Sequence, residues 1–169
     1  MHKGLNEPHI FLVSSNPQVL MRNLRGVLTT PQLRKIQAEV DSNVVGLFQL
    51  GDKHFTFAKG LSNADWRQKI SRYYYGAYNV RRALALNHSG AFSTDSSDHK
   101  SVDQIPDSLP NNGAHKQMLK NLRDDRNLCD YSHMARETDL LVPLPNVEAL
   151  VTLFINDVRS YLNTNGVAV

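Results

Sequence analysis

The chain has 169 residues, of which 41% are hydrophobic and 21% are charged. This composition is typical of a globular protein with one domain and a substantial core. The single cysteine, Cys129, excludes an intrachain disulfide, and no apolar run approaches the ~20 residues that span a bilayer. A net charge of +3 supports a polyanionic partner only weakly. The first residues lack the apolar core of a signal peptide, so we expect a cytoplasmic protein.

Apolar residues at helical spacing predict an all-α fold. A first helix is expected after Pro17. A second is expected from Thr30 and Pro31 towards Leu47, because proline is favoured in the first turn of a helix. Within residues 48–57, aromatic and polar residues alternate, which indicates a short hairpin.

The next helix is expected from Ser62 to about Asn87, since Ser62 and Asp65 resemble a capping box. Its tyrosines Tyr73 and Tyr74 are expected in the core. Another helix begins near Gly113 and carries the segment around Arg126. Between these two helices lies a long polar loop, residues 88–112, which is functional or solvated. A metal site there is an alternative, although its acidic residues and histidines have no recognised ligand spacing: His88, Asp95, Asp98, His99 and Asp103.

The C-terminal helix has the clearest pattern. Asn146 is a plausible N-cap, and a continuous apolar face follows with the spacing i, i+3, i+4, i+7. That face consists of Val147, Leu150, Val151, Phe154, Ile155, Val158 and Leu162. Gly166 lies past the expected end. We divide the chain into an N-terminal helical extension, residues 1–57, and a helical core, residues 58–169, within one compact unit.

Arg126 and His133 form the most informative pair of residues. Seven steps of about 100° fall about 20° short of two turns, so both side chains share a face if the helix continues to His133. A guanidinium is always charged, whereas an imidazole titrates near neutrality. One face would then carry a phosphate clamp and a general acid or base, which is a minimal set for cutting RNA without a metal or cofactor.

Two segments together resemble the HEPN superfamily of small all-α domains. Residues 66–78 contain a tyrosine pair before small residues, and residues 126–133 match the family pattern of Arg, four to six residues, then His, with polar Asn127 after the Arg. The pair Asp130 and Tyr131 resembles a subgroup motif of Arg, two residues, Ala, Asp and Tyr, with Cys129 in place of the Ala. His99 and Lys100 resemble a His-Lys pair of the same subgroup.

The resemblance covers about residues 58–165. It implies an antiparallel helical bundle of HEPN type with additional N-terminal helices. It also implies a metal-independent endoribonuclease in a toxin-antitoxin or antiphage defence setting. Ala135 departs from the family pattern, because silenced toxins carry a tyrosine at that position, two residues after the motif His. Some members of the subgroup lack the His, so a non-catalytic module that binds RNA, a nucleotide or a partner protein is the alternative. A structural helical dimer or antitoxin component is a third.

The resemblance assigns catalysis to Arg126 and His133. Asn127 is suited to bind a phosphate or ribose oxygen. Asp130 either orients one of the two or forms an i, i+4 ion pair. Tyr131 either stacks on a base or packs in the core, and packing is favoured. A row of Lys116, Lys120 and Arg123 is a candidate RNA-binding surface.

The spacing of the pair also constrains the assembly. Seven residues of straight helix span about 10.5 Å, so both side chains reach one phosphate only if the Arg reaches far or the helix ends between them. A two-fold dimer is another solution, because it brings two copies of the motif to one groove. The resemblance implies the same arrangement, since HEPN nucleases are dimers with a composite site. We therefore expect a homodimer that acts on RNA. An antitoxin or another regulatory protein is a further candidate partner. A Cys129–His133 nucleophile pair is conceivable, but a lone Cys on an apolar stripe is more often a buried hydrophobe.

Overall fold

The computed structural model describes residues 16–91 and 96–169, and at residues 96–98 the backbone only. Within these ranges every regular element is helical, which confirms the all-α prediction. The helices are α3 (Pro17–Asn23), α4 (Thr30–Gly60), α5 (Trp66–Ser89), α6 (Asn112–Tyr131) and α7 (Leu144–Thr164). Short 3-10 turns are η1 (Asn63–Asp65), η2 (Ser96–Ser101) and η3 (Glu137–Asp139).

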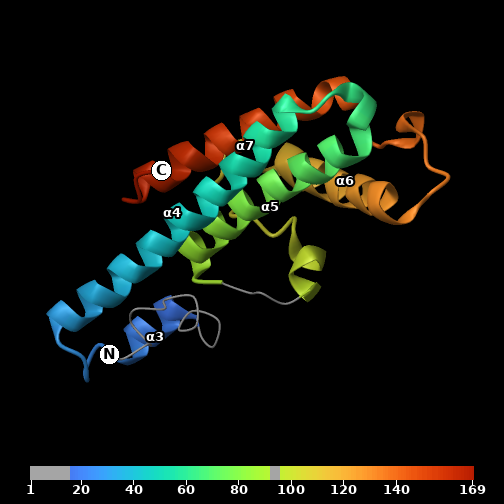
Figure 1. The fold of residues 1–169 in the computed structure, drawn as a ribbon. Helices are drawn as coiled ribbons and strands as arrows, with labels where there is room; N and C mark the ends of the chain where they lie inside the picture. The colour runs from blue at the N-terminus through green and yellow to red at the C-terminus, as the bar shows by residue number, and fades with distance from the viewer. Residues whose placement is uncertain (1–15, 92–95) are drawn as a thin grey trace, which may run out of the picture.

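Helix α5 lies at the centre of the fold. It packs against α4, α6 and α7, and α3 lies beside the N-terminal part of α4 (Figure 1). Most helices of globular proteins bury one stripe and leave the opposite face in water. α5 instead has buried residues on all sides between residues 73 and 86: Tyr73, Tyr74, Gly76, Ala77, Tyr78, Asn79, Val80, Arg81, Ala83, Leu84, Ala85 and Leu86. The tyrosines Tyr73 and Tyr74 are fully buried, as predicted.

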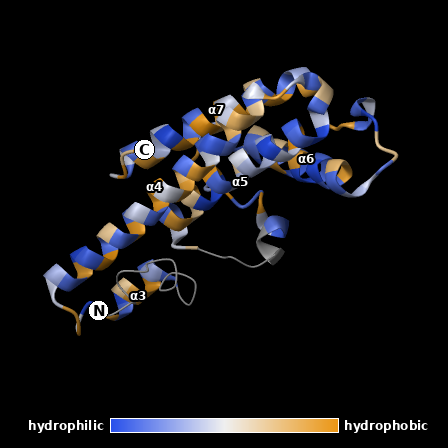
Figure 2. Cartoon of the chain, in the orientation of Figure 1, coloured by the Kyte–Doolittle hydropathy of each residue, from blue (hydrophilic) through white to orange (hydrophobic). Residues whose placement is uncertain are grey.

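Helix α7 confirms the apolar face predicted for the C-terminal segment, with one exception. All of its predicted core residues are buried except Leu150, which is 37% exposed. The helix begins at Leu144, before the predicted cap at Asn146, and Gly166 follows its end with a positive φ of 85°. Hydrophobic and hydrophilic residues alternate around this helix and around α4 (Figure 2).

The hairpin prediction for residues 48–57 is wrong, because α4 runs unbroken from Thr30 to Gly60. Its predicted start at Thr30 is confirmed. Phe48 and Phe55 are seven residues apart, so they share a face of α4, and both are buried. Phe57 lies on another side and is 57% exposed. The helix also crosses the boundary that we placed after residue 57, so this boundary does not coincide with the end of an element.

Two glycines let α4 and α5 approach closely. A Cβ atom built on Gly51 would lie 2.7 Å from the carbonyl oxygen of Gly76 and 2.7 Å from Cγ2 of Val80. A Cβ on Gly76 would lie 3.2 Å from the backbone nitrogen of Phe55. The obstacles include backbone atoms, which cannot move aside as a flexible side chain can. The separation of the two helices is therefore set by the absence of side chains at this crossing.

Replacing Gly51 by alanine should force α4 away from α5 and lower the free energy of unfolding by about 1–3 kcal/mol, as overpacking does. Gly46→Ala is the matched control, because Gly46 lies in the same helix with no atom within 4 Å of a new Cβ. That change should raise the stability by about 0.5–1 kcal/mol through helix propensity. Urea denaturation of the two variants measures both changes in the free energy of unfolding. Equal effects would contradict the close approach.

Candidate functional site

Arg126 is held in place by three neighbours from two helices. Its Nη2 donates to the hydroxyl of Tyr75 on α5 at 2.6 Å, and its Nη1 donates to Oδ1 of Asn127 at 3.1 Å. Nε lies 2.7 Å from Oδ2 of Asp130, an i, i+4 ion pair whose angle does not meet that of a hydrogen bond. The rings of Tyr75 and Tyr131 lie 5.4 and 5.5 Å from the guanidinium carbon. The head group of Arg126 is therefore fixed in position.

The arrangement keeps Arg126 charged and leaves part of it available. Burial alone would lower the pKa of Arg126, but Tyr75 and Asp130 more than offset this and raise it. A guanidinium has five N–H donors. Hydrogen bonds within the described residues engage one N–H on each terminal nitrogen, so one N–H on each of these two nitrogens remains. Guanidinium N–H groups form strong hydrogen bonds to phosphate oxygens.

A cavity of about 680 Å³ opens beside Arg126. Its wall combines three cations with aromatic and amide groups: Tyr74, His99, Lys100, Arg123, Asp124, Arg126, Asn127 and Tyr131. This volume lies within the range of small-molecule sites. Tyr75 and Asp130 line a neighbouring hollow instead, with Arg67 and Arg72, so they hold Arg126 from outside the cavity. We call this cavity the Arg126 pocket.

His133 does not share a helix face with Arg126, so the prediction of a common face is wrong. Helix α6 ends at Tyr131, and His133 lies in an exposed turn beyond it. It is also absent from the lining of the Arg126 pocket of its own chain. The helix does end between the two motif residues, which is one of the conditions under which they were expected to reach one phosphate. The structure of a single chain nevertheless leaves His133 outside the pocket.

The turn that carries His133 is fixed by Arg67, a partly buried cation from α5. Nη1 of Arg67 donates to the carbonyl oxygens of Cys129 and Ser132, both at 2.8 Å, and Nη2 donates to that of Ala135 at 2.7 Å. Carbonyl groups at the end of a helix have no partner within the helix, and a cation there is favourable. Arg67 therefore satisfies the end of α6 and determines the path of the chain through His133.

The far end of the same loop is fixed by Asp125. This buried carboxylate accepts hydrogen bonds from the backbone N–H groups of Leu141 at 2.7 Å and Val142 at 3.0 Å. Burial raises the pKa of Asp125, and these two hydrogen bonds partly counteract the rise. The segment from Ser132 to Val142 is thus tied to α5 at its start and to α6 at its end.

Replacing Arg67 by methionine keeps an unbranched side chain but removes three hydrogen bonds and the guanidinium over the Trp66 ring, so it should lower the free energy of unfolding by about 2–3 kcal/mol. Amide exchange at Ser132 and Ala135 should accelerate, because their turn loses its anchor. Arg72→Met is the control on the same helix, since Arg72 is exposed and its guanidinium lies over the Phe57 ring. It should change stability by less than about 0.5 kcal/mol. Unchanged exchange in the Arg67 variant would contradict the anchoring role.

The supporting residues have separate positions. Tyr131 is 75% exposed, so the favoured prediction that it packs in the core is wrong, and its ring lies at the pocket wall. Asp130 forms the predicted i, i+4 pair with Arg126. The Oδ1 atom of Asn127 accepts from Arg126, which leaves its amide N–H groups to donate.

His99 and Tyr74 are site residues that the sequence did not single out. His99 lies in η2, within the long loop between α5 and α6, and its Nδ1 is 2.6 Å from the hydroxyl of Tyr74. Its ring stacks on Tyr78 with centroids 4.3 Å apart. Burial raises the pKa of Tyr74, so this phenol stays protonated. The sequence had named His99 twice, in the metal alternative and in the His-Lys pair of the resemblance, and neither gave it an acid–base role.

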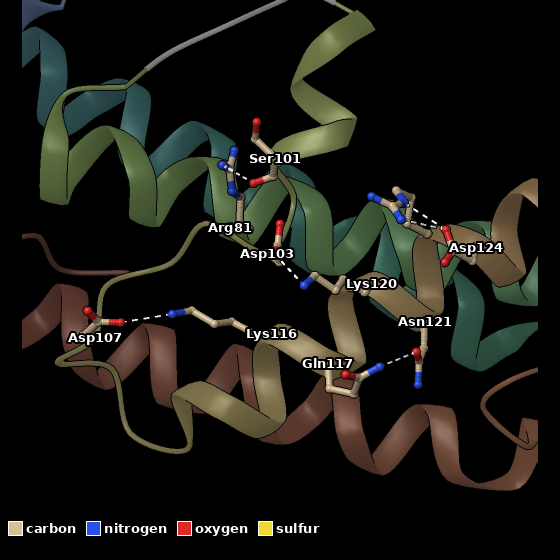
Figure 3. A network of polar contacts seen from close by, with 10 residues as sticks. Arg81, Ser101, Asp103, Asp107, Lys116, Gln117, Lys120, Asn121 and Asp124 are labelled. Atoms are coloured by element: carbon tan, nitrogen blue, oxygen red, sulfur yellow. Dashed lines mark hydrogen bonds and ion pairs between the residues drawn. The ribbon is translucent and has the colours of Figure 1, made fainter.

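The basic row of α6 does not form a free cationic surface. Lys116 pairs with Asp107 and Lys120 with Asp103, both at 3.0 Å (Figure 3), while Arg123 pairs with Asp124 at 2.9 Å. The hydrogen bond from Lys120 is the main cause of the lowered pKa of Asp103. Lys116 lines a second cavity, of about 510 Å³, with Arg81 and His88. Only Arg123 of the row reaches the Arg126 pocket.

The loop that offered a metal alternative lies partly outside the described residues, since Asp95 belongs to the undescribed part. Among the residues that the structure does describe, no group of three or more His, Cys, Asp or Glu side chains could hold a metal ion. None of the helices in these ranges combines the length and apolar character needed to cross a bilayer.

Cys129 is a buried hydrophobe of the core, 6% exposed. Burial raises the pKa of its thiol to about 12. Because only the thiolate is an effective nucleophile, Cys129 is not activated for catalysis.

In the folded protein Cys129 should therefore react with iodoacetamide at pH 8 at least about a hundredfold more slowly than in urea. Mass spectrometry of timed samples measures the modified fraction. Rapid alkylation of the folded protein would show that the thiol is accessible and ionised.

We compared the chain with models of protein families, with curated proteins and with solved structures, and no significant match was found in any of the three.

Proposed function

We propose that the protein is a metal-independent endoribonuclease of HEPN type. The observation that carries the proposal is the guanidinium of Arg126, which is fixed in position by its neighbours, lines the Arg126 pocket and keeps two N–H groups that no contact within the described residues engages. RNA contains its own nucleophile, the 2′-hydroxyl, so an enzyme needs to deprotonate it, hold the phosphate and stabilise the developing charge. In this proposal Arg126 holds the phosphate, and Asn127 donates to a phosphate or ribose oxygen.

Lys100 supports a polyanionic ligand in the same pocket, whereas the charge of Arg123 is paired with Asp124. The exposed ring of Tyr131 supports a single-stranded RNA, because unpaired bases stack on accessible aromatic side chains. A role in toxin-antitoxin or antiphage defence, with a regulatory protein as partner, rests on the resemblance to HEPN domains alone.

We further propose that the active form is a homodimer. His133 lies outside the pocket of its own chain, so a second copy is the source of a histidine that completes the site. Three large apolar side chains between residues 131 and 141 are more than half exposed, namely Tyr131, Met134 and Leu141. A two-fold interface would bring these segments of the two copies together and cover them.

RNA cleavage in EDTA tests the proposed activity. Wild type should cut a single-stranded RNA to a 2′,3′-cyclic phosphate and a 5′-hydroxyl. Arg126→Ala and His133→Ala should each lose about 10²–10⁴-fold in rate, the range for a lost phosphate clamp or acid–base group. Arg159→Ala, which removes one positive charge from α7, should keep the wild-type rate. Cleavage that needs a divalent ion, or that survives Arg126→Ala, would contradict the proposal.

Mixing the two inactive variants tests the dimer. If Arg126 and His133 of one site come from different chains, a heterodimer of the variants has one intact site. A statistical mixture should then recover about a quarter of the wild-type activity, because half of the dimers carry one intact site of two. A mixture that stays inactive, although sedimentation shows subunit exchange, would place both residues of each site in one chain.

One observation favours a second candidate, a non-catalytic module that binds RNA or a nucleotide. Only one of the two motif residues lines the pocket, and Arg126 is already in contact with Tyr75, Asn127 and Asp130. Binding of RNA without cleavage, lost in Arg126→Ala, would support this module instead of the nuclease.

A further inference from the structure

The Arg126 pocket contains a histidine of its own. His99 lines the same wall as Arg126, although 27 positions separate them in the sequence, because η2 packs on the tyrosine side of α5. Cleavage through the 2′-hydroxyl has two proton transfers, one from the nucleophile and one to the 5′-oxygen that leaves. One histidine in the neighbourhood of Arg126 accounts for only one of them.

Contacts with Tyr74 and Tyr78 help to fix the orientation of His99. The Tyr74 hydroxyl lies 2.6 Å from Nδ1, and the Tyr78 ring stacks on the imidazole at an interplanar angle of 21°. A phenol both donates and accepts hydrogen bonds. It can donate to Nδ1 of the neutral ring and accept from the N–H of the charged ring, so Tyr74 supports both protonation states. Nε2 is then the nitrogen that transfers a proton.

The surroundings of the ring are mixed in charge. The face of Tyr78 stabilises an imidazolium as it does other cations, and Asp124 also lines the pocket. The cations on the pocket wall disfavour an imidazolium at His99. Among the described side chains, the titratable and charged groups around His99 are Tyr74, Tyr75 and Tyr78 of α5, Arg123, Asp124 and Arg126 of α6, and the adjacent Lys100.

We propose that His99 is the general acid of the RNA cleavage reaction, an inference that rests on the proposed function. The 2′-oxygen loses its proton to a base and forms a bond to phosphorus, while the bond from phosphorus to the 5′-oxygen breaks. Nε2 of His99 gives its proton to that 5′-oxygen. The products are a 2′,3′-cyclic phosphate and a 5′-hydroxyl. His133 is then the base, and Tyr74 is a positioning residue that acts through His99.

An RNA whose leaving 5′-oxygen is replaced by sulfur tests this role, because a thiolate leaves without protonation. His99→Gln keeps a side chain able to reach the Tyr74 hydroxyl. This variant should cut ordinary RNA about a hundredfold or more slowly than wild type, but should cut the 5′-thio RNA within a few-fold of the wild-type rate. Arg126→Ala should be slow on both substrates, since it contacts the phosphate and not the leaving atom.

Tyr74→Phe provides a second variant if His99→Gln fails to fold. It should lose several-fold on ordinary RNA and recover on the 5′-thio RNA. Equal losses on both substrates, in variants that melt at the wild-type temperature, would show a structural role for His99 and overturn the inference while leaving the nuclease intact. A wild-type protein that cuts neither substrate would contradict the proposed function and this inference with it.

Discussion

The structure depends on one face of α5. Polar side chains on this face bind the segment that precedes α6 in the chain and the segment that follows it. Arg67, Tyr74 and Arg81 recur every seven residues, so they lie along one side of the helix. Arg67 binds the carbonyls after α6. Tyr74 binds His99, and Arg81 donates to the carbonyl oxygens of Ser101 at 2.6 Å and Gln104 at 3.3 Å before α6. Tyr75, the next residue after Tyr74, binds Arg126 itself.

This arrangement explains why the pocket forms where it does. Helix α5 is buried on its remaining sides by α4 and α7, and the glycine crossing between Gly51 and Gly76 keeps it close to α4. Its position is therefore independent of the pocket. This fixed helix carries the side chains that bind the peptide carbonyls and the guanidinium of Arg126. These side chains therefore hold the site in a defined geometry with little reorganisation, which is what electrostatic catalysis needs.

Much of the fold could be predicted from periodicity, because α7 and the tyrosines of α5 bury regular apolar faces. The end of α6 could not be predicted in this way. No glycine or proline follows Tyr131 directly, and the helix ends where Arg67 of another helix takes its last carbonyls. The second half of α4 was misread because Phe55 and Phe57 alternate with polar residues, although only Phe55 is buried. Arg126 was identified by its motif, whereas His99 depends on how a long loop folds back onto α5, which no local pattern encodes.

The central claim is that RNA binds at the Arg126 pocket. NMR titration with a short 2′-O-methyl RNA, which cannot supply the nucleophile, tests it most directly. The account predicts that the Nε–H signal of Arg126, the side-chain amide of Asn127 and the ring of His99 shift together and saturate. Shifts confined to the groove at the N-terminal end of α4, which is lined by Arg22, Arg25 and Arg34, would contradict this claim.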